Sequence, residues 1–267
     1  MNELIVLLKD THPIDINHPH SPWKYNIESC FINDYSYNHA QCLFEFAFTI
    51  TKHNSNNKIS IDPNNFDIKH KLDTTYLSVP INVCWLFYSS KLDIMVISFT
   101  GTYNETLALI DSEYLQCDPN VLNNYKQGMK VHCGFYKLYS YIRDDLIKLV
   151  SKYHNNKTQI LISGYSLGGA TSTLCCLDLY DKNIRHYTFG SPRVFNTVGA
   201  DHFNSLNISS YRCFNISDIV TTVPMPVMGM FEACDYKHIG KCITFDHNLQ
   251  TNYKNHVDVY IDHYKYN

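Results

Sequence analysis

The sequence has neither an excess of one charge nor a long hydrophobic run. Its 22 lysines and arginines stand against 25 aspartates and glutamates, which gives a formal net charge of −3. We therefore expect no nucleic-acid partner, because a surface that binds nucleic acid needs clustered positive charge. No stretch approaches the roughly eighteen apolar residues of a membrane-spanning helix, so we also expect no membrane span.

The sequence has little that indicates a metal site or an export signal. The fourteen histidines are scattered, and the ten cysteines include no CxxC pair of the kind that binds zinc. We therefore expect no metal. The apolar run at residues 4–8 follows Glu3 rather than positive charge, which is not typical of a secretory signal. On this basis we expect an intracellular, cytoplasmic protein whose cysteines are thiols.

Strand and helix patterns alternate along most of the chain. Residues 1–36 contain three prolines and are expected to form an extended N-terminal segment. Strand patterns lie at 81–88, 92–99, 160–162, 184–189, 210–215 and 239–245, and helix patterns at 38–50, 134–154, 200–206 and 256–266. The helix at 134–154 has Arg143 on its polar face. The alternation predicts one α/β domain over residues 1–267, with a mostly parallel sheet flanked by helices.

A glycine-rich turn joins the apolar run at 160–162 to a helical stretch. It reads GYSLGG at residues 164–169, with glycines two places before and two places after Ser166. A nucleophile elbow needs glycine there, because a side chain would collide with the crossing strand or helix. Ser166 would then lie at a helix N-terminus, which favours negative charge. The alternative is a turn that serves only close packing.

A reactive serine needs a base and a carboxylate, which in this arrangement follow it in the order acid, then histidine. Asp218 comes just after the predicted strand 210–215, although an aspartate there could also simply form the turn. Of the later histidines, His238 opens the last predicted strand and His263 lies within the closing helix. His256 is the favoured base because it lies at a loop-to-helix junction, and His247 stays open as the alternative.

When a serine attacks a carbonyl group in acyl transfer, a tetrahedral intermediate forms, and its oxyanion needs two N–H donors. The residue after the nucleophile, Leu167, supplies one of them. The second comes from a loop that ends an earlier strand, and here that loop is TGT at residues 100–102. Thr102 could add its hydroxyl to its own N–H. A small-residue turn without this role is the alternative.

Six segments in order resemble the class 3 (fungal-type) lipases of the α/β-hydrolase fold, over about residues 80–262. SFTGT at 98–102 stands for the family pattern F-R-G-[ST], VHCGF at 131–135 for V-H-x-G-F, and GYSLGG at 164–169 for G-[HY]-S-L-G-G. TFGSPRV at 188–194 stands for T-F-G-x-P-R-V, NISDIV at 215–220 for N-x-x-D-x-V, and YKHIG at 236–240 for Y-x-H-V-G. The resemblance implies an α/β-hydrolase fold.

By this resemblance Ser166 is the nucleophile, Asp218 the triad acid, and Thr102 with Leu167 the oxyanion hole. The family's histidine precedes a pattern like H-S-M-D-x-Y-I, which HVDVYI at 256–261 fits with one residue missing, in favour of His256.

Three further positions bear on the resemblance. Thr100 stands where the family has an arginine outside the triad, so we expect altered local packing there rather than lost activity. His132 and His238 match positions that are structural in the family.

Lipase substrates are apolar, so the mouth of the site should be apolar too. Leu107 and Ile110 fall where the family carries its lid, and Met225 and Met228 follow the acid. Flexible methionine-rich surface suits varied acyl chains, although both segments could equally be buried loops.

We expect a lipase that cleaves acyl esters of glycerolipids, without a cofactor, on lipid or small ester substrates. It would touch lipid surfaces transiently. A phospholipase A1, acyltransferase or thioesterase on the same triad, or an idle scaffold, are the alternatives.

Overall fold

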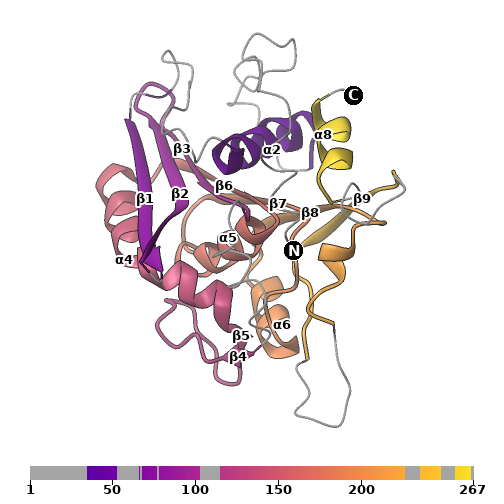
Figure 1. Cartoon of the computed structure of the whole chain (residues 1–267). Helices are drawn as coiled ribbons and strands as arrows, with labels where there is room; N and C mark the ends of the chain where they lie inside the picture. Colours follow the sequence, from indigo (N-terminus) through magenta and orange to yellow (C-terminus); the bar gives the residue numbers. More distant parts are fainter. Residues whose placement is uncertain are drawn as a thin grey trace.

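Seven of the described strands form one sheet in the order β1-β2-β3-β6-β7-β8-β9 (Figure 1). The structure is a computed structural model, which describes residues 35–52, 66, 68–76, 78–102, 115–225, 235–247 and 256–265. The strands of this sheet are β1 (Ile68–Tyr76), β2 (Val79–Ser89), β3 (Ile94–Phe99), β6 (Gln159–Tyr165), β7 (Ile184–Phe189), β8 (Ser209–Asn215) and β9 (Lys241–Phe245). A two-stranded sheet pairs β4 (Gln116–Cys117) with β5 (Val131–His132).

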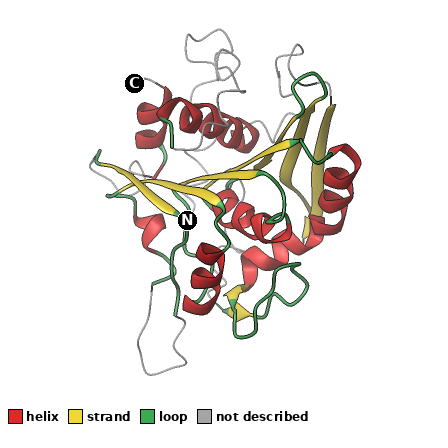
Figure 2. Ribbon diagram, turned by 180° about the vertical axis from the view of Figure 1, so that it is seen from behind, coloured by secondary structure: helices red, strands yellow, loops and turns green. Residues whose placement is uncertain are grey.

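The helices lie on both faces of the large sheet (Figures 1 and 2). Those on one face are α2 (Tyr37–Lys52) and α8 (Asp258–Lys265), and those on the other are α4 (Cys133–Tyr153), α5 (Leu167–Asp178) and α6 (Thr197–Ser205). A short 3₁₀ helix, η4 (Ile219–Thr222), follows β8. The predicted α/β layering, with helices flanking a sheet, is confirmed.

The sheet is mostly parallel, as predicted. β1, β2 and β3 pair antiparallel, and β3, β6, β7, β8 and β9 then run parallel to one another. The predicted strand pair 81–88 and 92–99 corresponds to β2 and β3. β1 was not predicted, because its sequence IKHKLDTTY alternates with polar residues and lies at the sheet edge. Since parallel strands end at the same edge, the loops after β3, β6, β7, β8 and β9 gather there.

Alternate residues of the central strands enter two separate hydrophobic cores. In β3, Met95, Ile97 and Phe99 pack with α4 and α5, whereas Ile94 and Val96 pack with α2. Successive side chains of a strand point to opposite faces, so a strand covered on both sides reads as a continuous apolar run. This burial explains why the strand was recognisable from its composition.

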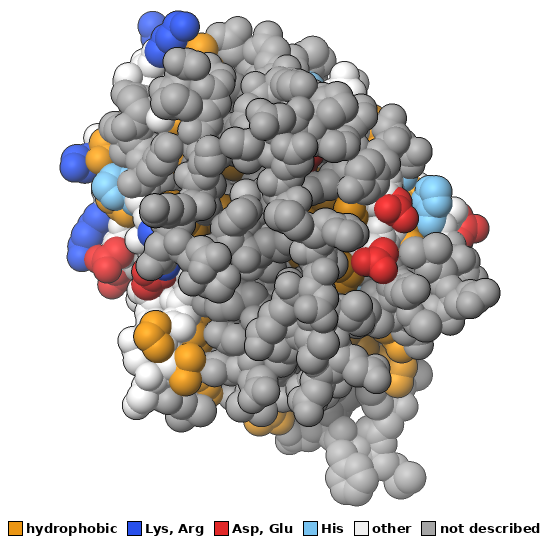
Figure 3. All heavy atoms as spheres, turned by 45° about the horizontal axis from the view of Figure 1, so that its top comes forward, with side chains coloured by type: hydrophobic (Ala, Val, Ile, Leu, Met, Phe, Trp, Pro, Cys, Tyr) orange, Lys and Arg blue, Asp and Glu red, His pale blue; other side chains and the backbone are white. Residues whose placement is uncertain are grey.

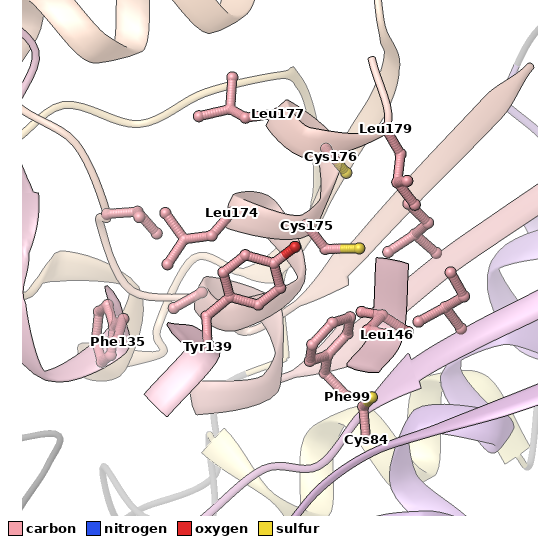
Figure 4. Packing of buried hydrophobic residues seen from close by; sticks show 14 of the residues in the cluster. Cys84, Phe99, Phe135, Tyr139, Leu146, Leu174, Cys175, Cys176, Leu177 and Leu179 are labelled. Atoms are coloured by element: carbon pink, nitrogen blue, oxygen red, sulfur yellow. The ribbon is translucent and has the colours of Figure 1, made fainter. Parts of the chain in front are cut away.

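The core between α4, α5 and the sheet contains cysteines that are thiols, as expected. Figure 4 shows Cys175 and Cys176 among Leu174, Leu177 and Tyr139. Among the described residues the cysteines are free, and burial raises the pKa of the Cys176 thiol well above its usual value. These two thiols therefore act as small apolar side chains.

An ion pair joins the partly exposed Arg143 of α4 to the buried Asp178 of α5. Arg143 was expected on the polar face of its helix, but its guanidinium instead binds the buried Asp178 through two hydrogen bonds, of 2.7 Å and 3.0 Å. Tyr139 donates a third hydrogen bond to the same carboxylate at 2.8 Å. An arginine side chain is long enough to reach from the rim of a helix to a buried acid, which periodicity alone does not register.

Several expectations fall outside the described residues. They include nearly all of the extended segment at 1–36, with only residues 35 and 36 described. Within the part of the chain that is described, no helix has the length and apolar character needed to cross a membrane. The face in Figure 3 carries acidic as well as basic side chains among its described residues, rather than a field of positive charge.

Candidate active site

Ser166 lies at the turn between β6 and α5 in a strained backbone conformation, with φ of 55° and ψ of −123°. A Cβ at Gly164 would come within 2.1 Å of the Gly168 carbonyl oxygen, and one at Gly168 within 2.3 Å of the Phe99 carbonyl oxygen. Only glycine fits either position. The Ser166 N–H donates to the carbonyl of Phe189 at 2.8 Å, which ties the turn to the neighbouring strand β7. Strain of this kind is maintained where the surroundings fix it, and it concentrates at functional sites.

Three side chains from different parts of the chain form a buried hydrogen-bonded series. Ser166 Oγ lies 2.9 Å from His256 Nε2, and His256 Nδ1 lies 2.8 Å from Asp218 Oδ2. An ionised carboxylate only accepts, so Nδ1 carries the proton and Nε2 is free to accept from the serine hydroxyl. Asp218 Oδ2 also accepts from the Tyr260 hydroxyl at 2.8 Å, and Oδ1 accepts from the Val220 N–H at 2.9 Å. Asp218 thus both caps η4 and holds the imidazole.

The other candidate histidines lie elsewhere. His247 is exposed, and its backbone exchanges hydrogen bonds of 2.8 Å and 3.1 Å with the Asn215 side chain. His238 Nε2 bonds a main-chain carbonyl of η4 at 2.7 Å, and His263 stacks on an aromatic ring of β9. Burial lowers the pKa of His238 to about 3 and that of His263 to about 4. Between the two histidines that the sequence left open, it is His256 that contacts the serine.

The expected oxyanion loop follows β3 at the same edge of the sheet. Thr102 is buried there, and Leu167 opens α5, where the first N–H groups of a helix lack helical partners. The Gly101 N–H donates to the Thr51 hydroxyl at 2.8 Å, so the end of α2 holds this loop. Thr100 donates its hydroxyl to a β2 carbonyl at 2.7 Å, which is the packing found where the family pattern has arginine.

Comparison with known proteins identifies the family. The model of a family described as Lipase (class 3) matches residues 94–228, just over half of the 267 residues. The chain belongs to this family. Among curated proteins, it is 36% identical over 117 residues to a lipase of Rhizomucor miehei, covering 40% of this chain and 32% of that protein. It is 30% identical over 161 residues to the secreted mono- and diacylglycerol lipase LIP1 of Malassezia globosa, covering 57% and 53%.

Solved structures of class 3 lipases share the fold. A lipase from Rhizopus microsporus var. chinensis matches with a TM-score of 0.59 at 23% identity, covering 77% of this chain and 72% of that one. A triacylglycerol lipase whose catalytic centre is described as a serine protease triad matches with a TM-score of 0.53 at 26% identity, covering 65% and 64%. The fold is therefore the α/β-hydrolase fold, as predicted. The chain spans about half or less of the length of the first curated relatives it matches.

The expected cytoplasmic location is wrong. Relatives from Malassezia globosa and Penicillium cyclopium are named secreted lipases. The expectation depended on a single short apolar run near the start of the sequence, and such a run carries no information about any segment that precedes it in a longer protein.

Exposed apolar residues lie close to Asp218 in the sequence of this class 3 lipase family member. Met225, which was expected in the apolar rim, is 64% exposed. Ile216 and Ile219, which the sequence analysis did not assign to the rim, flank Asp218 with 54% and 50% exposure. Their signal was present in the apolar positions of NISDIV. The other residues expected in the rim, Leu107, Ile110 and Met228, lie outside the described residues.

The site also contains aromatic residues that the sequence analysis missed. Tyr260 lies in α8 and His256 just before it, with ring centroids 6.1 Å apart, and both side chains bond Asp218 Oδ2. Across the described ranges, no group of three or more His, Cys, Asp or Glu side chains is arranged to hold a metal ion.

Proposed function

We propose that this class 3 lipase family member is a serine carboxylic-ester hydrolase that cleaves acyl esters of glycerolipids. The observation that carries the proposal is the buried series of hydrogen bonds from Ser166 through His256 to Asp218. A serine hydroxyl becomes nucleophilic when a base accepts its proton, and this arrangement provides the base with the correct tautomer. We also propose that residues 1–267 form a single domain, since described strands from 68 to 245 share one sheet.

In the proposed reaction, Ser166 Oγ attacks the ester carbonyl while His256 Nε2 takes its proton. Asp218 stabilises the imidazolium, and the oxyanion of the tetrahedral intermediate accepts hydrogen bonds from the Leu167 and Thr102 N–H groups. His256 then returns the proton to the leaving alcohol, and the C–O bond breaks to give the acyl-enzyme. Water, deprotonated by His256, attacks this ester in turn, and the fatty acid leaves as Ser166 regains its proton. The reaction needs no cofactor.

The substrate class follows from the rim of the site. The exposed apolar residues Ile216, Ile219 and Met225, which are near Asp218 in the sequence, suit an acyl chain or the surface of a lipid aggregate better than a polar substrate. We propose transient contact with such a surface. The names of the relatives point the same way, because they describe lipases of monoacylglycerols, diacylglycerols and triacylglycerols. Leu107, Ile110 and Met228 are proposed to complete the rim.

Hydrolysis of p-nitrophenyl butyrate tests the reaction. The wild-type protein should release p-nitrophenol, and Ser166→Ala should lower kcat by about a thousandfold or more. The kcat of His256→Ala should fall by a similar factor, whereas the kcat of the matched variant His247→Ala should stay within about twofold of wild type. Equal rates for wild type and Ser166→Ala would refute the proposal, and a loss confined to His247→Ala would move the base to that residue.

Fatty-acid release from lipid emulsions then tests the substrate class. Glycerolipids without a phosphate head group, such as tributyrin and diolein, should be cleaved faster than phosphatidylcholine vesicles. A preference for phosphatidylcholine would instead favour the phospholipase A1 alternative, and transfer of the acyl group to an added alcohol over water would favour the acyltransferase.

A further inference from the structure

Tyr165, which precedes the proposed nucleophile, also contacts the proposed base. Its hydroxyl donates a hydrogen bond to the main-chain carbonyl of His256, across 91 residues of sequence. Its ring stacks on the His256 imidazole, with ring centroids 5.2 Å apart and planes inclined by only 20°. The last residue of β6 therefore touches both the backbone and the side chain of the histidine.

Tyr165 is itself held on several sides. The rings of Phe44, Phe48 and Tyr260 pack edge-on against it at centroid distances of 6.0 Å, 5.7 Å and 5.8 Å. It is 2% exposed, so its ring has little room to turn. A Cβ at Gly101 would come within 2.9 Å of the Tyr165 carbonyl oxygen, so the oxyanion loop also lies against this residue. A ring fixed in this way can fix whatever stacks on it.

The two hydrogen bonds of His256 leave one rotation of its ring unrestrained. Nδ1 bonds Asp218 and Nε2 bonds Ser166, which fixes the line through the two nitrogens but not the tilt of the ring about that line. A nearly parallel ring beside the imidazole restricts this tilt. The electron-rich face of a phenol ring also attracts a cation, and the imidazole becomes a cation only as the serine gives up its proton.

We propose that Tyr165 is a positioning residue for the base, holding the His256 backbone by its hydroxyl and the imidazole plane by its ring. This inference rests on the proposed function. Because a positioned imidazole and a stabilised imidazolium act in the transition state, the loss of Tyr165 should lower kcat and leave KM nearly unchanged.

Three variants separate this role from simple core packing. Tyr165→Phe deletes the hydroxyl and keeps the ring, and Tyr165→Leu deletes both. The matched control Phe87→Leu removes a buried ring of the same core that packs on Phe46 and Phe66. Each protein is checked by its melting curve, and kcat and KM for p-nitrophenyl butyrate are measured per active site titrated with a fluorophosphonate. We expect kcat to fall about 2- to 10-fold in Tyr165→Phe and about 10- to 100-fold in Tyr165→Leu, with KM within about twofold.

Phe87→Leu should lose thermal stability as Tyr165→Leu does but keep the wild-type kcat. A lower kcat in Tyr165→Phe supports the backbone anchor, and a lower kcat in Tyr165→Leu alone supports the ring contact. Wild-type kcat in Tyr165→Phe, combined with a Tyr165→Leu protein that is fully active or unfolded, overturns the proposal. Failure of the proposed function is distinct, since wild type would then hydrolyse the ester no faster than Ser166→Ala.

Discussion

Acid should destabilise this protein through His186, a residue of β7 that has no solvent-exposed surface. Its Nε2 lies 2.9 Å from the Ser172 hydroxyl and its Nδ1 2.9 Å from the Ser210 hydroxyl. Desolvation disfavours the charged imidazolium, so burial lowers the pKa of His186 from 6.5 to about 3. Two serine hydroxyls satisfy a neutral ring, and neither carries a negative charge that would offset that of an imidazolium.

The direction and size of this acid destabilisation follow from the difference between the pKa of His186 in the folded and the unfolded chain. The unfolded chain binds a proton at this histidine below pH 6.5, whereas the folded chain stays neutral down to about pH 3. The free energy of unfolding therefore does not depend on His186 protonation above pH 6.5. As the pH falls from 6.5 to about 3, it decreases by about 1.4 kcal/mol for each pH unit. At pH 5.0 the loss amounts to about 2 kcal/mol, a large part of the stability of an ordinary domain.

Urea unfolding of wild type and His186→Gln, at pH 7.5 and pH 5.0, measures this directly. Glutamine keeps a polar side chain between the two hydroxyls but cannot titrate in this range. The variant should be less stable than wild type at pH 7.5, yet its loss of stability on acidification should be about 2 kcal/mol smaller. The remaining histidines are the same in both proteins, so their effects cancel. Equal losses in the two proteins would refute the argument.

Three other substitutions should have distinct effects. Tyr260→Phe removes the hydroxyl that donates to the Asp218 carboxylate and accepts from the buried Asn215 N–H, so we expect kcat in ester hydrolysis to fall about 10- to 100-fold and the melting temperature to fall as well; an unchanged kcat would contradict this. Gly168→Ala would bring a Cβ within 2.3 Å of a main-chain oxygen, so expression should yield little folded protein by circular dichroism. Asp178→Asn removes the buried carboxylate that Arg143 and Tyr139 share and should cost about 2–3 kcal/mol in urea unfolding, while a loss below 1 kcal/mol would show that the ion pair matters little.

The sequence was most informative where burial was complete. β3 and β6 are covered on both faces and read as apolar runs, and the amphipathic pattern at 134–154 marked α4 almost to the residue. β1 escaped detection because a strand at a sheet edge keeps polar residues on its less covered side. The ends of α6 also differed from expectation, since the helix begins after the Asn196 cap rather than near residue 200.

Some residues of the candidate site could also be predicted from the sequence, and others could not. Local spacing pointed to Ser166 because glycine is required on both sides of so sharp a turn. The choice between His247 and His256 depended on how the chain returns from β9 to α8, which spacing along the sequence does not specify. The contacts of Tyr165 and Tyr260 with the base and the acid were missed for a related reason, since aromatic residues near a motif resemble ordinary core until their partners are known. The catalytic roles themselves stay predictions, to be decided by experiment.

The most direct test of the central claim is the site of covalent labelling by a fluorophosphonate. We expect intact-mass analysis to show one adduct per chain, and peptide mapping to place it on Ser166, because the His256 imidazole can accept the proton of this serine and Asp218 can stabilise the resulting cation. Ser166→Ala and acid-unfolded wild type should remain unlabelled. A wild-type protein that takes up no label, or a Ser166→Ala protein that is labelled to the same extent, would contradict the assignment of Ser166 as the nucleophile.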